Sequence, residues 1–157
     1  MNISKILCAV DLAEDCSLIA KYANKMAKDM GSEVLVLYAA PTLKQYVGFH
    51  VQPDTIGHFV DEITTAAQEK MDSFVASNFT DVKAEGRVVV GYASEEILRA
   101  SVREQCDLII MSTHGRTGLD RILFGSVAEK VVQKSSIPVL SLRPEDLERI
   151  EREEQSA

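Results

Sequence analysis

The sequence predicts an α/β domain built on a doubly wound, mainly parallel five-stranded sheet with helices on both faces. Short apolar runs rich in β-branched residues alternate along the chain with longer segments in which apolar residues recur at helical spacing. Several of these runs are apolar at almost every position, as expected of strands buried on both faces of a parallel sheet. The 157 residues are enough for one such domain with a substantial core.

Five apolar runs are predicted as strands. The second is the nearly continuous apolar run EVLVLYA, and the third contains Gly86, which we expect to break it. The predicted strands cover residues 3–10, 33–39, 83–90, 107–113 and 137–142. Parallel strands require crossover connections, which are almost always right-handed, so the arrangement is Rossmann-like.

Four helices are predicted between these strands. Gly31 is expected to end the first helix, and Ser94 is expected to cap the third. The fourth begins near Ser126 and lasts about three turns. The predicted helices cover residues 18–30 and 56–79, a segment from 94 to about 105, and the segment that follows 126.

Composition limits the classes of function. The formal net charge is −7 and the pI is near 5.0, which argues against a nucleic-acid surface and against docking to anionic membranes. Residues 144–157 carry a balance of −4, so we divide the chain into a domain over 1–143 and an acidic C-terminal tail over 144–157. No apolar stretch approaches the roughly 18 residues of a membrane span, and no signal peptide is evident. We therefore expect a cytoplasmic protein.

The three cysteines form no C-x-x-C pair, which argues against a disulfide scaffold or a zinc site. Cys8 is expected to be a small buried apolar residue. No cluster of side chains near the loop after the fourth predicted strand suggests a metal site or a nucleophile and base. We assign no catalytic residue and no metal ligand.

That loop is the strongest functional signal. It carries Gly115, Gly118 and Gly125 and leads into the fourth predicted helix. Main-chain amides at a helix start have no internal partner, and glycine lets a phosphate approach them closely. The G-x-x-x-x-G-K-[ST] and G-x-G-x-x-G patterns are absent. The residues alone leave a second interpretation equally open, a plain turn in which Ser126 and Glu129 form a capping box.

Asp11, which follows the first predicted strand, is the second signal. An aspartate there commonly forms a turn or a cap, and it can also accept a hydrogen bond from an adenine amine or a ribose hydroxyl. In doubly wound sheets, ligands bind beyond the carboxyl ends of the strands where strand order reverses. If the first and fourth strands are neighbours, Asp11 and the glycine loop border one crevice.

Several segments closely resemble the universal stress protein family, over about residues 3–143. They are KILCAVD at 5–11, MSTHGRTGL at 111–119, FGSVAE at 124–129 and IPVL at 137–140. The ATP-binding branch of this family has the motif G, two residues, G, nine residues, G and Ser or Thr. Gly115, nine residues and Gly125-Ser126 fit the motif, while Ser112 stands at the first glycine position. A serine there could crowd the nucleotide or hydrogen-bond to it.

The resemblance implies a stress-response module that binds ATP, which Mg²⁺ could accompany through the phosphates. Carried over residue by residue, the resemblance implies three groups of contacts with the nucleotide. His114 could also contact a phosphate, or it could make only a local hydrogen bond. Ala9, Val10, Asp11 and Ala39 would border the adenine and ribose; Met111 and Ser112 would line the sugar; Gly115, Arg116, Gly125, Ser126 and Val127 would hold the phosphates.

The resemblance also implies a homodimer paired through the last strand, whose apolar edge invites pairing with another copy. Any ATP hydrolysis would be slow, because the sequence places no evident base or transition-state clamp. Two alternatives stay open. One is an adenine-nucleotide hydrolase or phosphotransferase, and the other is a nucleotide-free stress protein that acts through protein contacts.

Overall fold

A computed structural model describes residues 2–12, 16–42, 53–113, 125–143 and 152. Its five strands form one parallel sheet in the order β3-β2-β1-β4-β5, which confirms the predicted fold class. The strands are β1 (Lys5–Val10), β2 (Glu33–Ala40), β3 (Ala84–Val90), β4 (Leu108–Ser112) and β5 (Val139–Leu142). β1 is central, with Cys8 opposite Val36 on β2 and Ile110 on β4.

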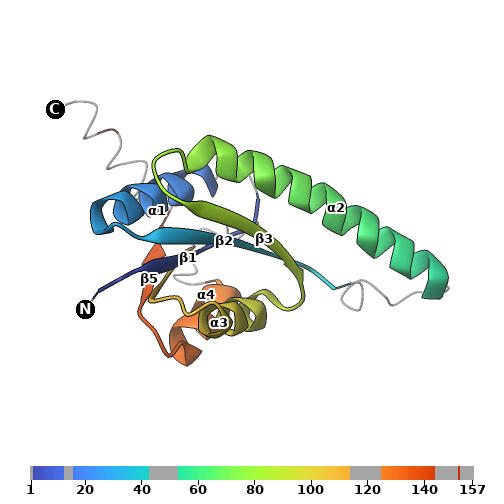
Figure 1. Ribbon diagram of the computed structural model, residues 1–157. Coiled ribbons are helices and arrows are strands. Elements are labelled where there is room, and N and C mark those ends of the chain that lie inside the picture. Colours follow the sequence, from blue (N-terminus) through green and yellow to red (C-terminus); the bar gives the residue numbers. More distant parts are fainter. Residues whose placement is uncertain (1, 13–15, 43–52, 114–124, 144–151, 153–157) are drawn as a thin grey trace.

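Four helices cover the two faces of the sheet, two on each (Figure 1). They are α1 (Cys16–Met30), α2 (Pro53–Asn78), α3 (Ala93–Arg103) and α4 (Ser126–Lys134). Side chains that alternate along the strands divide the core into two clusters. Ile6 and Cys8 pack on the face of α1 and α2, whereas Leu7 and Ile109 pack on the face of α3 and α4.

Gly86 does not break β3, contrary to the sequence prediction. It pairs with Val36 inside a continuous strand. A Cβ at this position would lie 2.5 Å from Cγ of Met71 and 3.0 Å from Cγ2 of Val75. The glycine therefore makes room for α2 to pack against β3.

The predicted cap of α3 is also wrong, and the capping box left open for α4 does not form. The N-cap residues are Tyr92 and Gly125, and neither helix start has a side-chain capping hydrogen bond. Ser94 is the second residue of α3 and is buried against the core. Ser126 is the first residue inside α4, so it cannot act as the N-cap residue that a capping box requires.

The helices within the described ranges include none that is long and apolar enough to cross a membrane. The boundary at 143 between a domain and an acidic tail stays a prediction, since most of 144–157 lies outside those ranges.

Candidate functional site

Strand order reverses between β1 and β4. The chain runs outward from β1 through β2 to β3 on one side, and β4 continues to β5 on the other. The two strands are direct neighbours, with Ala9 opposite Met111. Asp11 follows the carboxyl end of β1 and Ser112 ends β4, so the two predicted signals do belong to one end of adjacent strands. We call this place the switch point; ligands of doubly wound sheets bind at such positions.

The backbone takes an unusual conformation just after β1. Leu12 has a φ of 56°, a left-handed conformation that costs a non-glycine residue about 1–2 kcal/mol. The residue is 4% exposed, so burial in the core offsets this cost and holds the conformation. Cys16, at the start of α1, also holds Asp11. Its thiol donates a hydrogen bond to Oδ1 of Asp11 over 2.6 Å, and the Asp11 N–H donates to Sγ over 3.4 Å.

Thr113 joins three elements at the switch point. Its N–H donates to the carbonyl of Leu142 over 2.9 Å, and its carbonyl accepts a hydrogen bond from the Gly125 N–H over 2.7 Å. The side chain is 3% exposed. These bonds fix the start of α4 beside the carboxyl ends of β4 and β5. Thr113 was predicted from the sequence as the last residue of the fourth strand and was given no part in the site.

The start of α4 offers main-chain donors at this end of the sheet. The first hydrogen bond within the helix runs from the Glu129 N–H to the Gly125 carbonyl over 3.0 Å. The amides of Ser126, Val127 and Ala128 precede it, and the first amides of an α-helix have no partner within the helix itself. The Gly125 amide is already paired with Thr113, so the donors of this helix start begin at Ser126. The helix dipole adds partial positive charge there.

The structure separates the predicted site residues by burial. Val10 and Met111 are 9% and 4% exposed and pack within the two core clusters. Their side chains therefore belong to the hydrophobic core on which the site is built. Ser126 is exposed. Six predicted residues are partly buried, namely Ala9, Asp11, Ala39, Ser112, Gly125 and Val127. The predictions for His114, Gly115 and Arg116 lie outside the described residues.

Two of the three thiols are unreactive at neutral pH. Cys8 is completely buried, as predicted, and burial together with the nearby Cys16 raises its pKa far above the ordinary value. Burial likewise raises the pKa of Cys106 to about 11. Both stay protonated at neutral pH and are poor nucleophiles. In the part of the chain that the structure describes, no group of three or more His, Cys, Asp or Glu side chains could hold a metal ion.

Comparison with known sequences identifies the family. The profile of the universal stress protein family (Usp) matches residues 2–143. The chain belongs to the universal stress protein family. The family predicted from the sequence motifs is thus confirmed, and membership of its ATP-binding branch stays a prediction.

Individual relatives agree with this placement. Universal stress proteins MJ0531 and MJ0577 of Methanocaldococcus jannaschii are each 30% identical to the chain; the matches cover 88% of this chain and 81% and 94% of those proteins. The solved structure of MJ0577 superposes with a TM-score of 0.79 at 29% identity, over 91% of this chain and 97% of that one. A universal stress protein from Archaeoglobus fulgidus, solved in complex with dAMP, shares the fold with a TM-score of 0.62 at 21% identity, over 90% and 98%.

Proposed function

We propose that this universal stress protein binds an adenine nucleotide, ATP, at the switch point between β1 and β4. One observation carries the proposal. A carboxylate, Asp11, and the amide donors of α4 belong to the carboxyl ends of the same two neighbouring strands. A nucleotide has hydroxyl and amine donors at one end and phosphates at the other, and this pair of protein groups complements both ends.

The charges of Asp11 and of the start of α4 indicate which part of the nucleotide each one binds. Asp11 is an acceptor and suits the ribose hydroxyls or the adenine amine. The amides of Ser126 and Val127, at the positive end of the dipole of α4, suit a phosphate. Gly115 and Arg116 would add donors from the loop, as the resemblance to the family implies. Mg²⁺, where present, would be held by the phosphates themselves.

Known relatives support the choice of adenine. The A. fulgidus universal stress protein was solved with dAMP, and the MJ0577 fold aligns over almost the whole chain. We extend the binding of an adenine nucleotide to the present protein as part of the proposal. Its activity would be that of a binding or signalling module with at most slow hydrolysis, because no base or transition-state clamp was found in the sequence.

The proposal is tested first on protein purified from cells without added nucleotide. Heat denaturation should release an adenine nucleotide, which chromatography against standards identifies. With ATP at about 100 times its Kd, the native protein should gain about 2.7 kcal/mol of stability. Absence of released nucleotide together with an unchanged melting temperature at millimolar ATP would support the alternative of a nucleotide-free stress protein.

We further propose a homodimer that pairs through β5. This strand bonds β4 on one side and is last in the order of the sheet, and all four of its residues are only partly buried. An apolar strand at a sheet edge is a template for another strand. Sedimentation should give twice the monomer mass, and Ser141→Pro, which removes a main-chain donor from the open edge of β5, should give a folded monomer. A wild-type monomer at high micromolar concentration would contradict this.

A further inference from the structure

Cys16 lies beside Asp11 at the switch point, and the proposed function does not yet use it. It is the first residue of α1 and is 8% exposed. Its sulfur donates to Oδ1 of Asp11 over 2.6 Å and accepts from the Asp11 main-chain N–H over 3.4 Å. One side chain therefore holds both the backbone and the carboxylate of the residue that follows β1.

Leu12, which directly follows Asp11, adds to the restraint. It takes its left-handed conformation with its side chain buried in the cluster that also contains Cys16 and Ile19. The residue after Asp11 is thus held by the core, while the thiol of Cys16 bonds to Asp11 itself. The direction of the Asp11 carboxylate is thereby set by packing that exists before any ligand arrives.

The other two cysteines have a different character. Cys8 and Cys106 lie among apolar side chains of the two core clusters and act as small apolar residues. Cys106 precedes β4 and so lies at the opposite end of the sheet from Asp11. It offers the same change of thiol to methyl at a place remote from the switch point.

We propose that Cys16 is a positioning residue for the nucleotide site, acting by orienting the Asp11 carboxylate. This inference rests on the proposed function, because it assigns Asp11 to the adenosine end of the ligand. An acceptor that is already oriented loses less side-chain freedom when it binds a ligand. A thiol is also a weak donor, so it can orient the carboxylate without competing strongly with the hydroxyl or amine of the ligand.

The test compares ATP affinity, measured by calorimetry on the full chain, across four proteins. Cys16→Ala removes the donor and should weaken binding about three- to tenfold. Cys16→Ser keeps a donor at the same place and should bind within about twofold of wild type. Cys106→Ala should leave affinity unchanged, and melting temperatures recorded for every variant show which proteins are folded.

The decisive comparison adds Asp11→Ala and the double variant with Cys16→Ala. If Cys16 acts through Asp11, Cys16→Ala should have no further effect on affinity once Asp11 is absent. Equal losses in both backgrounds would overturn the inference, because the thiol would then act by another route. Wild-type affinity in Cys16→Ala would overturn it as well.

This experiment distinguishes a failure of the inference about Cys16 from a failure of the proposed nucleotide binding. If wild-type protein binds no adenine nucleotide, the proposed function fails and the inference fails with it. If wild type binds but Asp11→Ala binds equally well, nucleotide binding stands and the role given to Cys16 is wrong. If Cys16→Ala does not fold, Cys16→Val, which fills the space of the thiol without a donor, replaces it in both backgrounds. It must weaken binding when Asp11 is present and have no further effect in Asp11→Ala, and wild-type affinity in Cys16→Val overturns the inference.

Discussion

The two ends of the sheet use their polar groups in opposite ways. At the amino end, where the strands begin, charged and polar side chains bond to one another and to neighbouring strands. At the carboxyl end, around the switch point, Asp11 and the start of α4 place an acceptor and main-chain donors together. The comparison separates the part of the molecule that secures the fold from the part that we propose for the ligand.

The amino end is held by bonds between strands. Asp107 Oδ2 accepts hydrogen bonds from the N–H groups of Ser4 and Lys5, over 2.8 and 3.0 Å. The Ser32 hydroxyl donates to the Ile3 carbonyl over 2.6 Å. These contacts join the starts of β1, β2 and β4, and their partners come from the protein itself.

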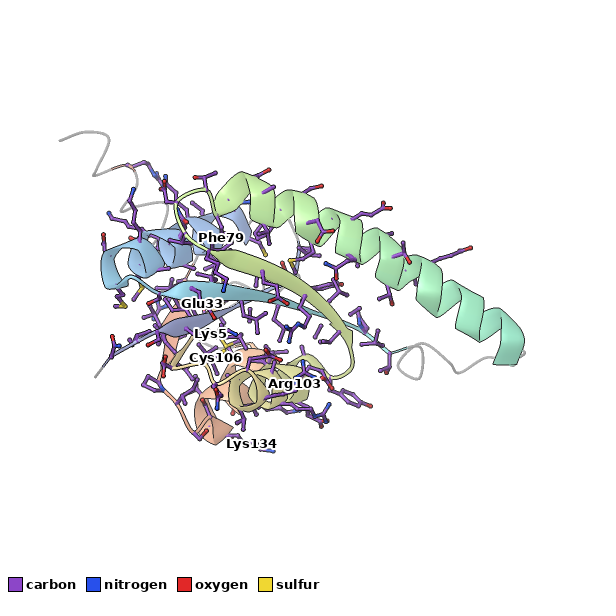
Figure 2. The ribbon with its side chains drawn as sticks, in the orientation of Figure 1. Lys5, Glu33, Phe79, Arg103, Cys106 and Lys134 are labelled. Atoms are coloured by element: carbon purple, nitrogen blue, oxygen red, sulfur yellow. The ribbon has the colours of Figure 1, made fainter. Side chains whose placement is uncertain are left out.

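A group of charges extends this end towards β3 and α3. Glu33 lies 3.4 Å from Nζ of Lys5 and 2.8 Å from Nζ of Lys83. Glu104 pairs with Arg87 and with Arg103, the latter over 2.9 Å. Figure 2 shows Lys5, Glu33 and Cys106 close together at this end of the sheet. Most of these side chains reach solvent, so each pair alone adds little stability.

The largest expected effect is at the carboxyl end. Asp11→Ala should weaken ATP binding about tenfold or more, because a hydrogen bond to a charged group is worth about 1.5–3 kcal/mol. The melting temperature should change little by comparison. Calorimetric titration and a thermal scan of the same sample measure the two quantities. Unchanged affinity would remove Asp11 from the site.

The matched substitution at the amino end should do the reverse. Asp107→Ala leaves the amides of Ser4 and Lys5 without their acceptor and should cost about 1–2 kcal/mol. For a chain of this size that lowers the melting temperature by about 2–8 °C. ATP affinity should stay as in wild type. A loss of affinity comparable to that of Asp11→Ala would show that the two ends are not separate in function.

The smallest effect is on acid stability. Hydrogen bonds from Lys83 hold the pKa of Glu33 below its ordinary value, and those from Arg87 and Arg103 do the same for the pKa of Glu104. A carboxyl with a lowered native pKa stabilises the fold above its unfolded pKa, and that stabilisation is lost as pH falls through the native value. The melting temperature should therefore fall between about pH 5 and about pH 3.

Glu104→Gln should make this acid-dependent fall shallower, because the glutamine has no carboxylate to protonate. About 1 M salt should also reduce the difference between wild type and variant, since the pairs are partly exposed to solvent. A fall in stability as steep in the variant as in wild type would remove Glu104 from the account.

Sequence reasoning found the fold and the end of the sheet where the site is proposed. The alternation of strand patterns with helix patterns along the sequence predicts a parallel sheet. The nearly continuous apolarity of β1, β2 and β4 indicates that these strands are buried. Asp11 and Ser112 came out as strand-end residues because a change from apolar to polar marks the end of a buried strand. These signals are local, and the sequence displays them directly.

Contacts across a turn could not be predicted. The bond from Cys16 to Asp11 joins residues five positions apart, and a leucine gives no sequence signal for the left-handed conformation that Leu12 takes after Asp11. The alternative of a capping box on Ser126 does not hold, because α4 begins at Ser126, one residue earlier than that capping box requires. A glycine inside an apolar run predicts a break in the strand. The structure shows instead that Gly86 leaves space for Met71 to pack against a continuous strand.

The central claim is that the switch point takes an adenine nucleotide. Calorimetric titration of ATP into nucleotide-free wild-type protein tests it most directly. The account predicts saturable binding, one nucleotide per chain, with a Kd of about 1 mM or tighter. Titration to several millimolar ATP without saturable heat at two temperatures, on protein that melts cooperatively, would contradict it.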